Sequence, residues 1–225
     1  YITIASTGNA TDFGDMSVAH TSVGACSDGT RGLFGGGQTT NVIQYLTIAS
    51  TGNTTDFGNL TLGRTGCRGV SNGTRGVFAG AGSASAGSGD PTMDYITIQS
   101  TGNATDFGDL TVTRRTLGGG MHNDVRGIYV GGYAPGEGAT VDTIDYITIA
   151  STGNASDFGN ATTNCSDNFG TSNGTRGVYG SGNGQSSNYS NHIEYVTMAS
   201  TGNGTDFGNL VSDAAARSAS SCSGD

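Results

Sequence analysis

The chain has 225 residues, of which 41 are glycine, and it carries a formal net charge of −9 with only 12% charged residues. Glycine this abundant without a Gly-X-Y period excludes a collagen-like chain, and the even spread of apolar residues argues against disorder. The nine basic residues are all arginine and are spread along an acidic chain, which excludes nucleic acid as a partner. No apolar run approaches the ~18 residues that span a bilayer, so no membrane insertion is expected.

The first recognisable element is a phrase of nine residues, TGNATDFGD, at Thr7–Asp15. It returns almost unchanged in four further copies, which begin at Thr51, Thr101, Thr152 and Thr201. A tyrosine precedes each copy, at Tyr1, Tyr45, Tyr95, Tyr146 and Tyr195. The resulting period of about 50 residues is typical of blade or solenoid arrays.

One period, taken over Ala19–Leu62, predicts four short strands and no helix. Residues 20–29 form a strand of small residues, and residues 30–37 form an apolar strand that ends in a glycine run. Residues 42–49 alternate between polar and apolar, and residues 54–62 carry Phe57. Ser-Thr-Gly-Asn separates the last two strands, where a hairpin turn needs residues that tolerate positive φ.

Four antiparallel strands per period, the innermost made of small residues, predict an all-β β-propeller of about five four-stranded blades. The expected repeats are residues 1–17 (a half blade), 18–62, 63–111, 112–161, 162–210 and 211–225 (an inner strand). The N-terminal third and fourth strands and the C-terminal first strand would share one blade that lacks its second strand. The chain is then either a segment of a longer array, which we favour, or another chain fills that blade.

The period resembles the kelch repeat. The second strand closes on glycines at Gly35–Gly37 and Gly131–Gly132, the third strand carries the tyrosine, and the fourth carries an aromatic residue where kelch blades commonly have Trp. The sequence pattern YITIASTGNATDFGDLTV…NGTRGVF also resembles repeats of structural and tail-fibre proteins of marine cyanophages. This resemblance implies a virion or extracellular location. It implies as partners other virion proteins, further copies of the chain, or host-surface glycan.

The repeated phrase contains residues that we expect to be structural. Its phenylalanines should pack between adjacent blades; they are Phe13, Phe57, Phe107, Phe158 and Phe207. We expect the preceding aspartates to pair with the arginines that open each second strand, through charge-assisted hydrogen bonds. The aspartates are Asp12, Asp56, Asp106, Asp157 and Asp206, and the arginines are Arg31, Arg75, Arg126 and Arg176. A ring of these arginines around the axis, binding an anion, is the alternative.

Constant and variable segments of the sequence occupy different parts of the period. The near-invariant turns after the first and third strands should share one end of the molecule, and the variable loops and the connections between repeats should share the other. A rigid scaffold that presents a recognition surface has this organisation. Because polar aromatics and arginine carry much interface energy, the candidate contact residues are Tyr133, Tyr189, His192, Arg64, Arg114 and His20. Each could equally be a solvated loop residue.

No catalytic, metal or cofactor pattern is present, so we expect a non-enzymatic protein. The cysteines Cys26, Cys67, Cys165 and Cys222 form no C-x-x-C pair and lie far from the three histidines. We interpret them as small buried residues, with a disulfide or a reactive thiol as alternatives. The leading hypothesis is a virion structural or adhesion domain. A cellular kelch-like interaction scaffold and a self-assembling surface filament subunit are the alternatives.

Overall fold

The computed structural model describes residues 1–37, 40–80, 82–83, 89–183 and 189–211. The inner strand expected within residues 211–225 falls, apart from Val211, outside these residues, and so does Cys222. Regular structure in the described residues is entirely β, and no helix there could span a membrane.

Four antiparallel sheets of four strands follow one another along the chain, each with its strands in spatial order. Sheet A contains β1 (Gly24–Ser27), β2 (Arg31–Gly35), β3 (Val42–Thr47) and β4 (Thr55–Asn59). Sheet B contains β6 (Arg68–Ser71), β7 (Arg75–Ala79), β9 (Thr92–Thr97) and β10 (Thr105–Asp109). Sheet C contains β11 (Gly120–His122), β12 (Arg126–Val130), β15 (Thr143–Thr148) and β16 (Ser156–Asn160). Sheet D contains β17 (Phe169–Ser172), β18 (Arg176–Asn183), β19 (Tyr189–Thr197) and β20 (Thr205–Asn209).

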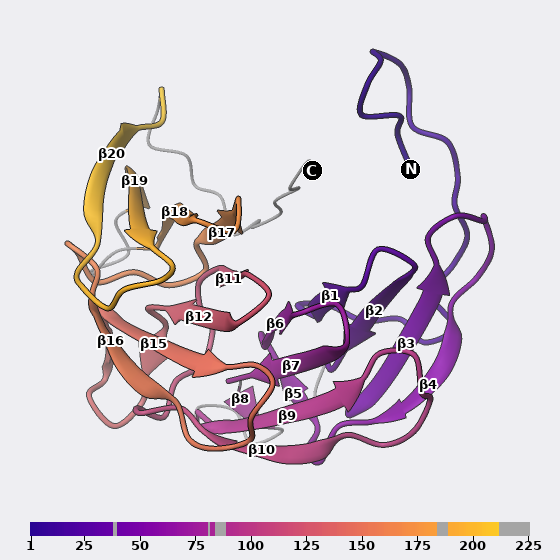
Figure 1. The fold of residues 1–225 in the computed structure, drawn as a ribbon, viewed down its shortest axis with the longest axis horizontal. Helices are drawn as coiled ribbons and strands as arrows, with labels where there is room; N and C mark the ends of the chain where they lie inside the picture. Colours follow the sequence, from indigo (N-terminus) through magenta and orange to yellow (C-terminus); the bar gives the residue numbers. More distant parts are fainter. Residues whose placement is uncertain (38–39, 81, 84–88, 184–188, 212–225) are drawn as a thin grey trace.

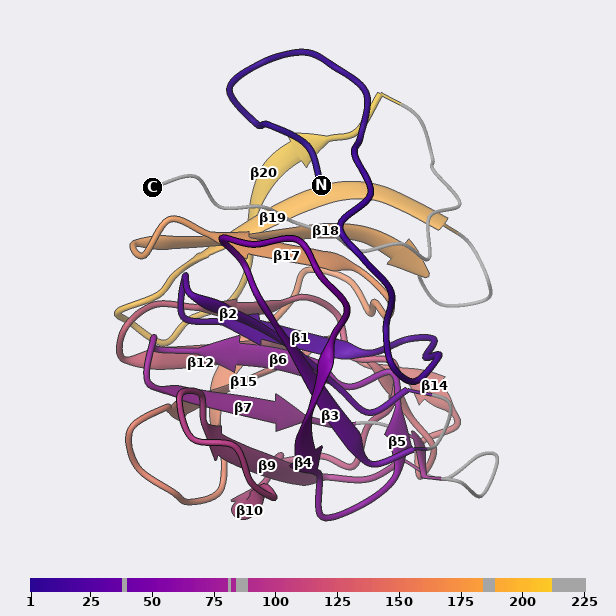
Figure 2. The same cartoon turned by 90° about the vertical axis from the view of Figure 1, so that its right-hand side faces the viewer.

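The sheets stand side by side around an open arc, with β1, β6, β11 and β17 on the inside and β4, β10, β16 and β20 on the outside (Figure 1). Figure 2 shows the same sheets from the side. Two short ribbons, β5 (Arg64–Thr65) with β8 (Gly82–Ser83) and β13 (Tyr133–Ala134) with β14 (Ala139–Thr140), lie outside the sheets. The expected all-β, β-propeller-like arrangement is confirmed.

The core lies between neighbouring sheets in three clusters. Phe57 packs with Phe78 and Ile98 between sheets A and B, and Phe107 packs with Tyr129 between sheets B and C. Phe158 occupies the same place between sheets C and D. These three phenylalanines are each 2% exposed, whereas Phe13 is half-buried and Phe207 is 54% exposed. A phenylalanine of the repeated phrase is therefore fully buried where its own sheet is followed by another sheet.

The constancy of the repeated phrase is explained by a set of contacts that we call the rim junction. At sheets A and B, Gly102 N–H donates to Phe57 O (2.8 Å) and Ala104 N–H to Asn59 O (2.8 Å), while Asn59 N–H donates to Asn103 Oδ1 (3.1 Å). The same three bonds join residues 13–15 to 52–54, residues 107–109 to 153–155, and residues 158–160 to 202–204. The phrases that begin at Thr51, Thr101 and Thr152 thus each supply an outer strand to one junction and a turn to another.

Three of the four repeated arginines bind the next sheet, and not the aspartates. Nη1 of Arg31, Arg75 and Arg126 donates to the carbonyls of Ile98, Ile149 and Met198 at 3.0–3.1 Å. Each guanidinium also lies over the third-strand tyrosine of its own sheet, 4.3–4.7 Å from the ring centroid.

The expected pairing of these arginines with Asp12, Asp56, Asp106, Asp157 and Asp206 is therefore wrong. The ion pairs among the described residues are two, and they involve other side chains. The third strand lies between the second-strand arginine and the fourth-strand aspartate, which explains the separation. Asp12, Asp106 and Asp206 instead accept the N–H of the glycine two residues later (3.0–3.3 Å). A ring of free arginines is equally unsupported, since three of the four guanidinium groups are engaged at junctions.

Residues 1–23 contain no strand, although the third and fourth strands of a blade were expected in residues 1–17. Part of that hairpin is nevertheless present. Tyr1 and Thr11 exchange two backbone hydrogen bonds (2.6 and 2.8 Å), and the rings of Tyr1 and Phe13 meet edge to face at 6.0 Å. An isolated two-stranded hairpin is marginally stable. Among the described residues no second strand lies beside this hairpin, and the rest of its ladder is not formed.

Candidate functional site: the loop face

The loops after the second strands and the connections between sheets emerge at one end of the arc, because successive strands are antiparallel. We call this end the loop face. The opposite end, the turn face, carries tight turns in which a side-chain oxygen accepts the N–H groups two and three residues later, at Asp28, Asn72, Asn123 and Asn173. Constant turn chemistry and variable loops therefore occupy different ends.

Backbone hydrogen bonds tie the variable segments of the loop face to one another. Gly37 N–H donates to Arg64 O (2.7 Å), which joins the β2–β3 loop to the connection between sheets A and B. Gly132 N–H donates to Cys165 O (2.7 Å), which does the same between sheets C and D. Ribbon β5–β8 makes a further link. The loop face is consequently a braced surface, although its sequence varies.

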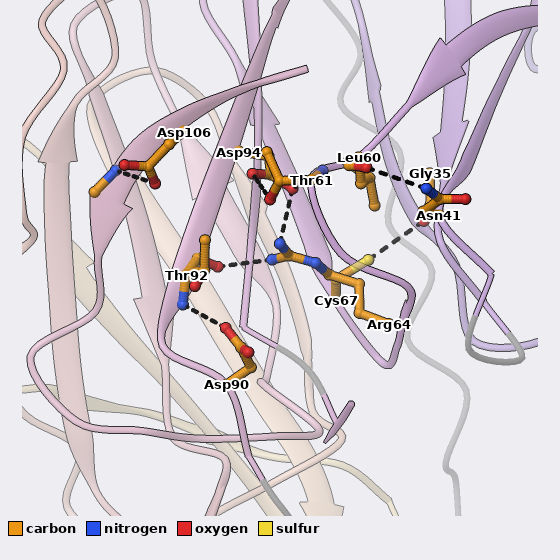
Figure 3. A network of polar contacts seen from close by, with 11 residues as sticks. Gly35, Asn41, Leu60, Thr61, Arg64, Cys67, Asp90, Thr92, Asp94 and Asp106 are labelled. Carbon is orange, nitrogen blue, oxygen red and sulfur yellow. Dashed lines mark hydrogen bonds and ion pairs between the residues drawn. The ribbon is translucent and has the colours of Figure 1, made fainter. Parts of the chain in front are cut away.

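Arg64, one of the expected contact residues, lies beneath this face and is fully buried. Its Nη2 pairs with Asp94 Oδ2 at 2.7 Å and its Nη1 donates to Thr92 O at 2.7 Å (Figure 3). Thr61 completes the carboxylate's partners through its N–H (3.1 Å) and Oγ1 (2.6 Å). Burial raises the pKa of Asp94, an effect that the Arg64 charge opposes.

Arg114 occupies the equivalent position in sheet C and is also fully buried. It pairs with Asp145 and donates Nη1 to Gly131 O and Thr143 O, both at 2.8 Å. Burial lowers the pKa of Arg114, and the Asp145 carboxylate opposes this shift. The predictions that Arg64 and Arg114 are surface contacts are therefore wrong. Each connection turns inward at this arginine, toward an acid on the third strand.

The acids belong to a set that the sequence interpretation missed. A polar residue directly precedes each third-strand tyrosine and is buried in every sheet, as Gln44, Asp94, Asp145 and Glu194. Gln44 accepts hydrogen bonds from the Ser17 and Thr54 hydroxyls (2.5 and 2.6 Å), and Glu194 from Thr162 and Tyr179 (2.6 and 2.8 Å). A polar residue recurring once per period within a buried strand was the available signal.

The remaining expected contact residues differ in their positions. His20 is half-buried with Nδ1 against Gly36 O, so it braces the β2–β3 loop. His192 is exposed on β19. Tyr189 pairs with Asn183 in the ladder of sheet D, but its side chain lies outside what the structure describes. The structure does not bring these residues together into one site.

Tyr133 forms the best-defined feature of the loop face, together with a residue that was not predicted. Arg115 and Tyr133 exchange two backbone hydrogen bonds (2.9 and 2.8 Å), and the guanidinium lies 4.7 Å from the ring centroid. Both side chains are half-buried. We call this pair the Arg115–Tyr133 platform. Alternation along the backbone turns Arg114 inward and leaves its neighbour Arg115 on the face, which residue type alone could not distinguish.

The described thiols have no reactive character. Cys26, Cys67 and Cys165 are free, so no disulfide joins them. Burial raises the pKa of Cys26 and Cys165 to about 12 and also raises that of Cys67, which leaves all three thiols protonated at neutral pH. Across the described ranges, no group of three or more His, Cys, Asp or Glu side chains could hold a metal ion.

No protein-family model matches this chain, and no curated protein matches it. Among solved structures, the one titled "Structure of YjhT" is similar, with a TM-score of 0.73 over 88% of this chain and 68% of that chain at 9% sequence identity. Similarity at so low an identity bears on the fold alone. The chain therefore shares the architecture of that structure, in agreement with its successive four-stranded antiparallel sheets.

Proposed function

We propose that the chain is a non-enzymatic structural and adhesion domain of a virus particle, of the phage tail-fibre or particle-surface kind, and that its loop face binds a host-surface or virion partner. The observation that carries the proposal is that the constant turns lie at one end of the molecule and the variable loops at the other. The constant residues form the rim junctions and the tight turns, whereas the variable loops form a braced face. A surface that varies on a rigid support is suited to recognition.

The proposal includes kelch-type blades, with an incomplete fifth blade to which residues 1–17 contribute. Each third-strand tyrosine contacts its fourth-strand phenylalanine edge to face at 5.9–6.2 Å, and the N-terminal pair has the same geometry. The glycines that close the second strands have positive φ, as at Gly36 (73°) and Gly131 (60°), a conformation that favours glycine. Both features are consistent with the kelch-like pattern of the repeat.

Glycan is the ligand class that fits the Arg115–Tyr133 platform. An aromatic ring can stack on a sugar, and a guanidinium presents fixed N–H donors to hydroxyl or carboxylate oxygens. The charge of Arg115 near the ring favours sugars that carry a carboxylate. The resemblance of the repeats to those of marine cyanophages supports the surface of a host cell as the source of such a sugar.

Binding to a glycan array and to intact host cells tests the proposal. We expect Tyr133→Ala and Arg115→Ala each to weaken binding at least 10-fold, while thermal melting confirms that both variants fold. Val125→Ala, at a 58% exposed position on the turn face, is the matched control and should bind like the original chain. Undiminished binding by both loop-face variants, or equal loss in the Val125 variant, would contradict the proposal.

A further inference from the structure

The outward side of sheet D displays the elements of a rim junction without the partner that the other sheets have. Phe207 is 54% exposed, against 2% for its counterparts Phe57, Phe107 and Phe158. A Cβ added at Gly208 would meet no atom within 4 Å, whereas at Gly108 it would meet the Gly153 backbone at 2.5 Å. Among the described residues, no turn donates its N–H groups to Phe207 O and Asn209 O, as Gly102 and Ala104 donate theirs to Phe57 O and Asn59 O.

Arg176 shows the same difference. Like the other second-strand arginines it lies over the tyrosine of its own sheet, 4.3 Å from the centroid of Tyr195. Its counterparts are half-buried and donate to a carbonyl of the following sheet, but Arg176 is exposed. Sheet D therefore presents one aromatic ring, one guanidinium and two outward carbonyls, and the other junctions show what groups these bind.

The segment Tyr1–Asp15 presents the complementary groups at the other end of the arc. Gly8, Asn9 and Ala10 stand in the repeat where Gly102, Asn103 and Ala104 supply the turn of a rim junction. Ile4 stands where Ile98 offers its carbonyl to Arg31. Its side chain is 76% exposed and that of Ile2 is 62% exposed, whereas Ile98 is fully buried and Ile96 is 3% exposed.

The two surfaces do not meet within one molecule. Figure 1 shows the N-terminal segment and β20 on opposite sides of the opening of the arc, and the exposure of Ile2, Ile4 and Phe207 agrees with this. The three junctions between sheets repeat the same hydrogen bonds, which fix the curvature of the arc, so closing it would require one or more of these junctions to shift. A second molecule can satisfy both surfaces without such a shift.

We propose that the chain associates head to tail, with segment Tyr1–Asp15 of one copy docking on sheet D of the next through a rim junction identical in pattern to those inside the molecule. Gly8 and Ala10 N–H donate to Phe207 O and Asn209 O, Asn9 Oδ1 accepts from Asn209 N–H, and Arg176 donates to Ile4 O. The interface is heterologous, so in a pair one copy keeps its segment surface free and the other keeps its sheet D surface free, and the assembly can extend.

Sedimentation velocity on the 225-residue chain over a concentration series tests this association, using Phe207→Arg to block the sheet D surface and Ile4→Arg to block the segment surface. The original chain should form species larger than a monomer, and each variant alone should self-associate at least 10-fold more weakly. An equimolar mixture of the two variants should form a dimer and nothing larger. The intact segment of the Phe207→Arg chain can bind the intact sheet D of the Ile4→Arg chain, and the other two surfaces are blocked. Ile48→Arg, a 43% exposed isoleucine at the equivalent position of sheet A, is the control and should associate like the original chain.

Failure of the mixture to form a dimer would overturn the proposal, as would a monomeric original chain at every concentration. A monomer that loses thermal stability on Ile4→Arg would indicate closure within one molecule and would also overturn it. The blocking residues lie away from the Arg115–Tyr133 platform, so the glycan and cell assays remain a separate test of the proposed function.

Discussion

Replacing Gly108 by alanine probes the rim junction, and Gly208 provides a matched control inside the same molecule. The two glycines occupy the same place in the repeated phrase and have nearly equal φ, 136° and 137°. Alanine is strained in this region by ~1–3 kcal/mol, and the strain is common to both sites. Only the neighbours differ, because Gly108 faces the Gly153 backbone and Gly208 faces open space.

The structure sets the size of the expected difference. An alanine Cβ at position 108 would lie 2.5 Å from the Gly153 carbonyl carbon and oxygen, so the turn must move away. That movement breaks the bonds Gly153 N to Phe107 O (2.7 Å), Ala155 N to Asp109 O (2.8 Å) and Asp109 N to Asn154 Oδ1 (3.0 Å). At ~1 kcal/mol net per hydrogen bond, Gly108→Ala should cost ~3 kcal/mol more than Gly208→Ala.

Urea and thermal unfolding followed by circular dichroism measure this difference, at concentrations low enough that copies do not associate. For a chain of this size, ~3 kcal/mol corresponds to a further fall in Tm of roughly 6–12 °C. Equal losses in the two variants would refute the view that the phrase is held constant by contact between sheets. They would indicate instead that the glycines are needed only for their own backbone conformation.

Three further predictions concern the core. Asp145→Asn should destabilise the chain by ~3–5 kcal/mol because it leaves the Arg114 guanidinium buried without its counter-charge. In urea titrations, the double variant Arg114→Met/Asp145→Asn should lose much less unfolding free energy than the sum of the two single changes. Additive losses would contradict this. Phe107→Ala should cost ~3–5 kcal/mol in the same assay, and Phe207→Ala less than half as much because that ring is 54% exposed; similar costs would count against packing between sheets. Burial lowers the pKa of His122 from its ordinary value of 6.5, so the fold favours the neutral ring, and the stability that the neutral ring contributes is present above pH 6.5 and is lost as the pH falls below it. The Tm of the chain should therefore fall between pH 7.5 and 5.5. An unchanged dependence of Tm on pH in His122→Gln would disprove the assignment of this effect to His122.

Periodicity alone was sufficient to predict much of this protein. The recurring tyrosine and the recurring phrase predict four strands per period, and Figure 1 shows the four sheets that result. These features are local, since alternation, glycine and turn residues act within a few positions of the chain. The separation of variable loops from constant turns also follows, because antiparallel order decides at which end each connection emerges.

The tertiary structure alone decided what the individual side chains do. Neighbouring Arg114 and Arg115 are indistinguishable as residue types, yet one is buried against an acid and the other lies over Tyr133 on the loop face. The phrases around Phe107 and Phe207 differ at two of nine positions, yet their phenylalanines differ in burial because one is followed by a sheet in the described structure and the other is not. A partner across a junction comes from a strand about 50 residues away. Its position depends on how whole sheets pack, and no local pattern encodes that.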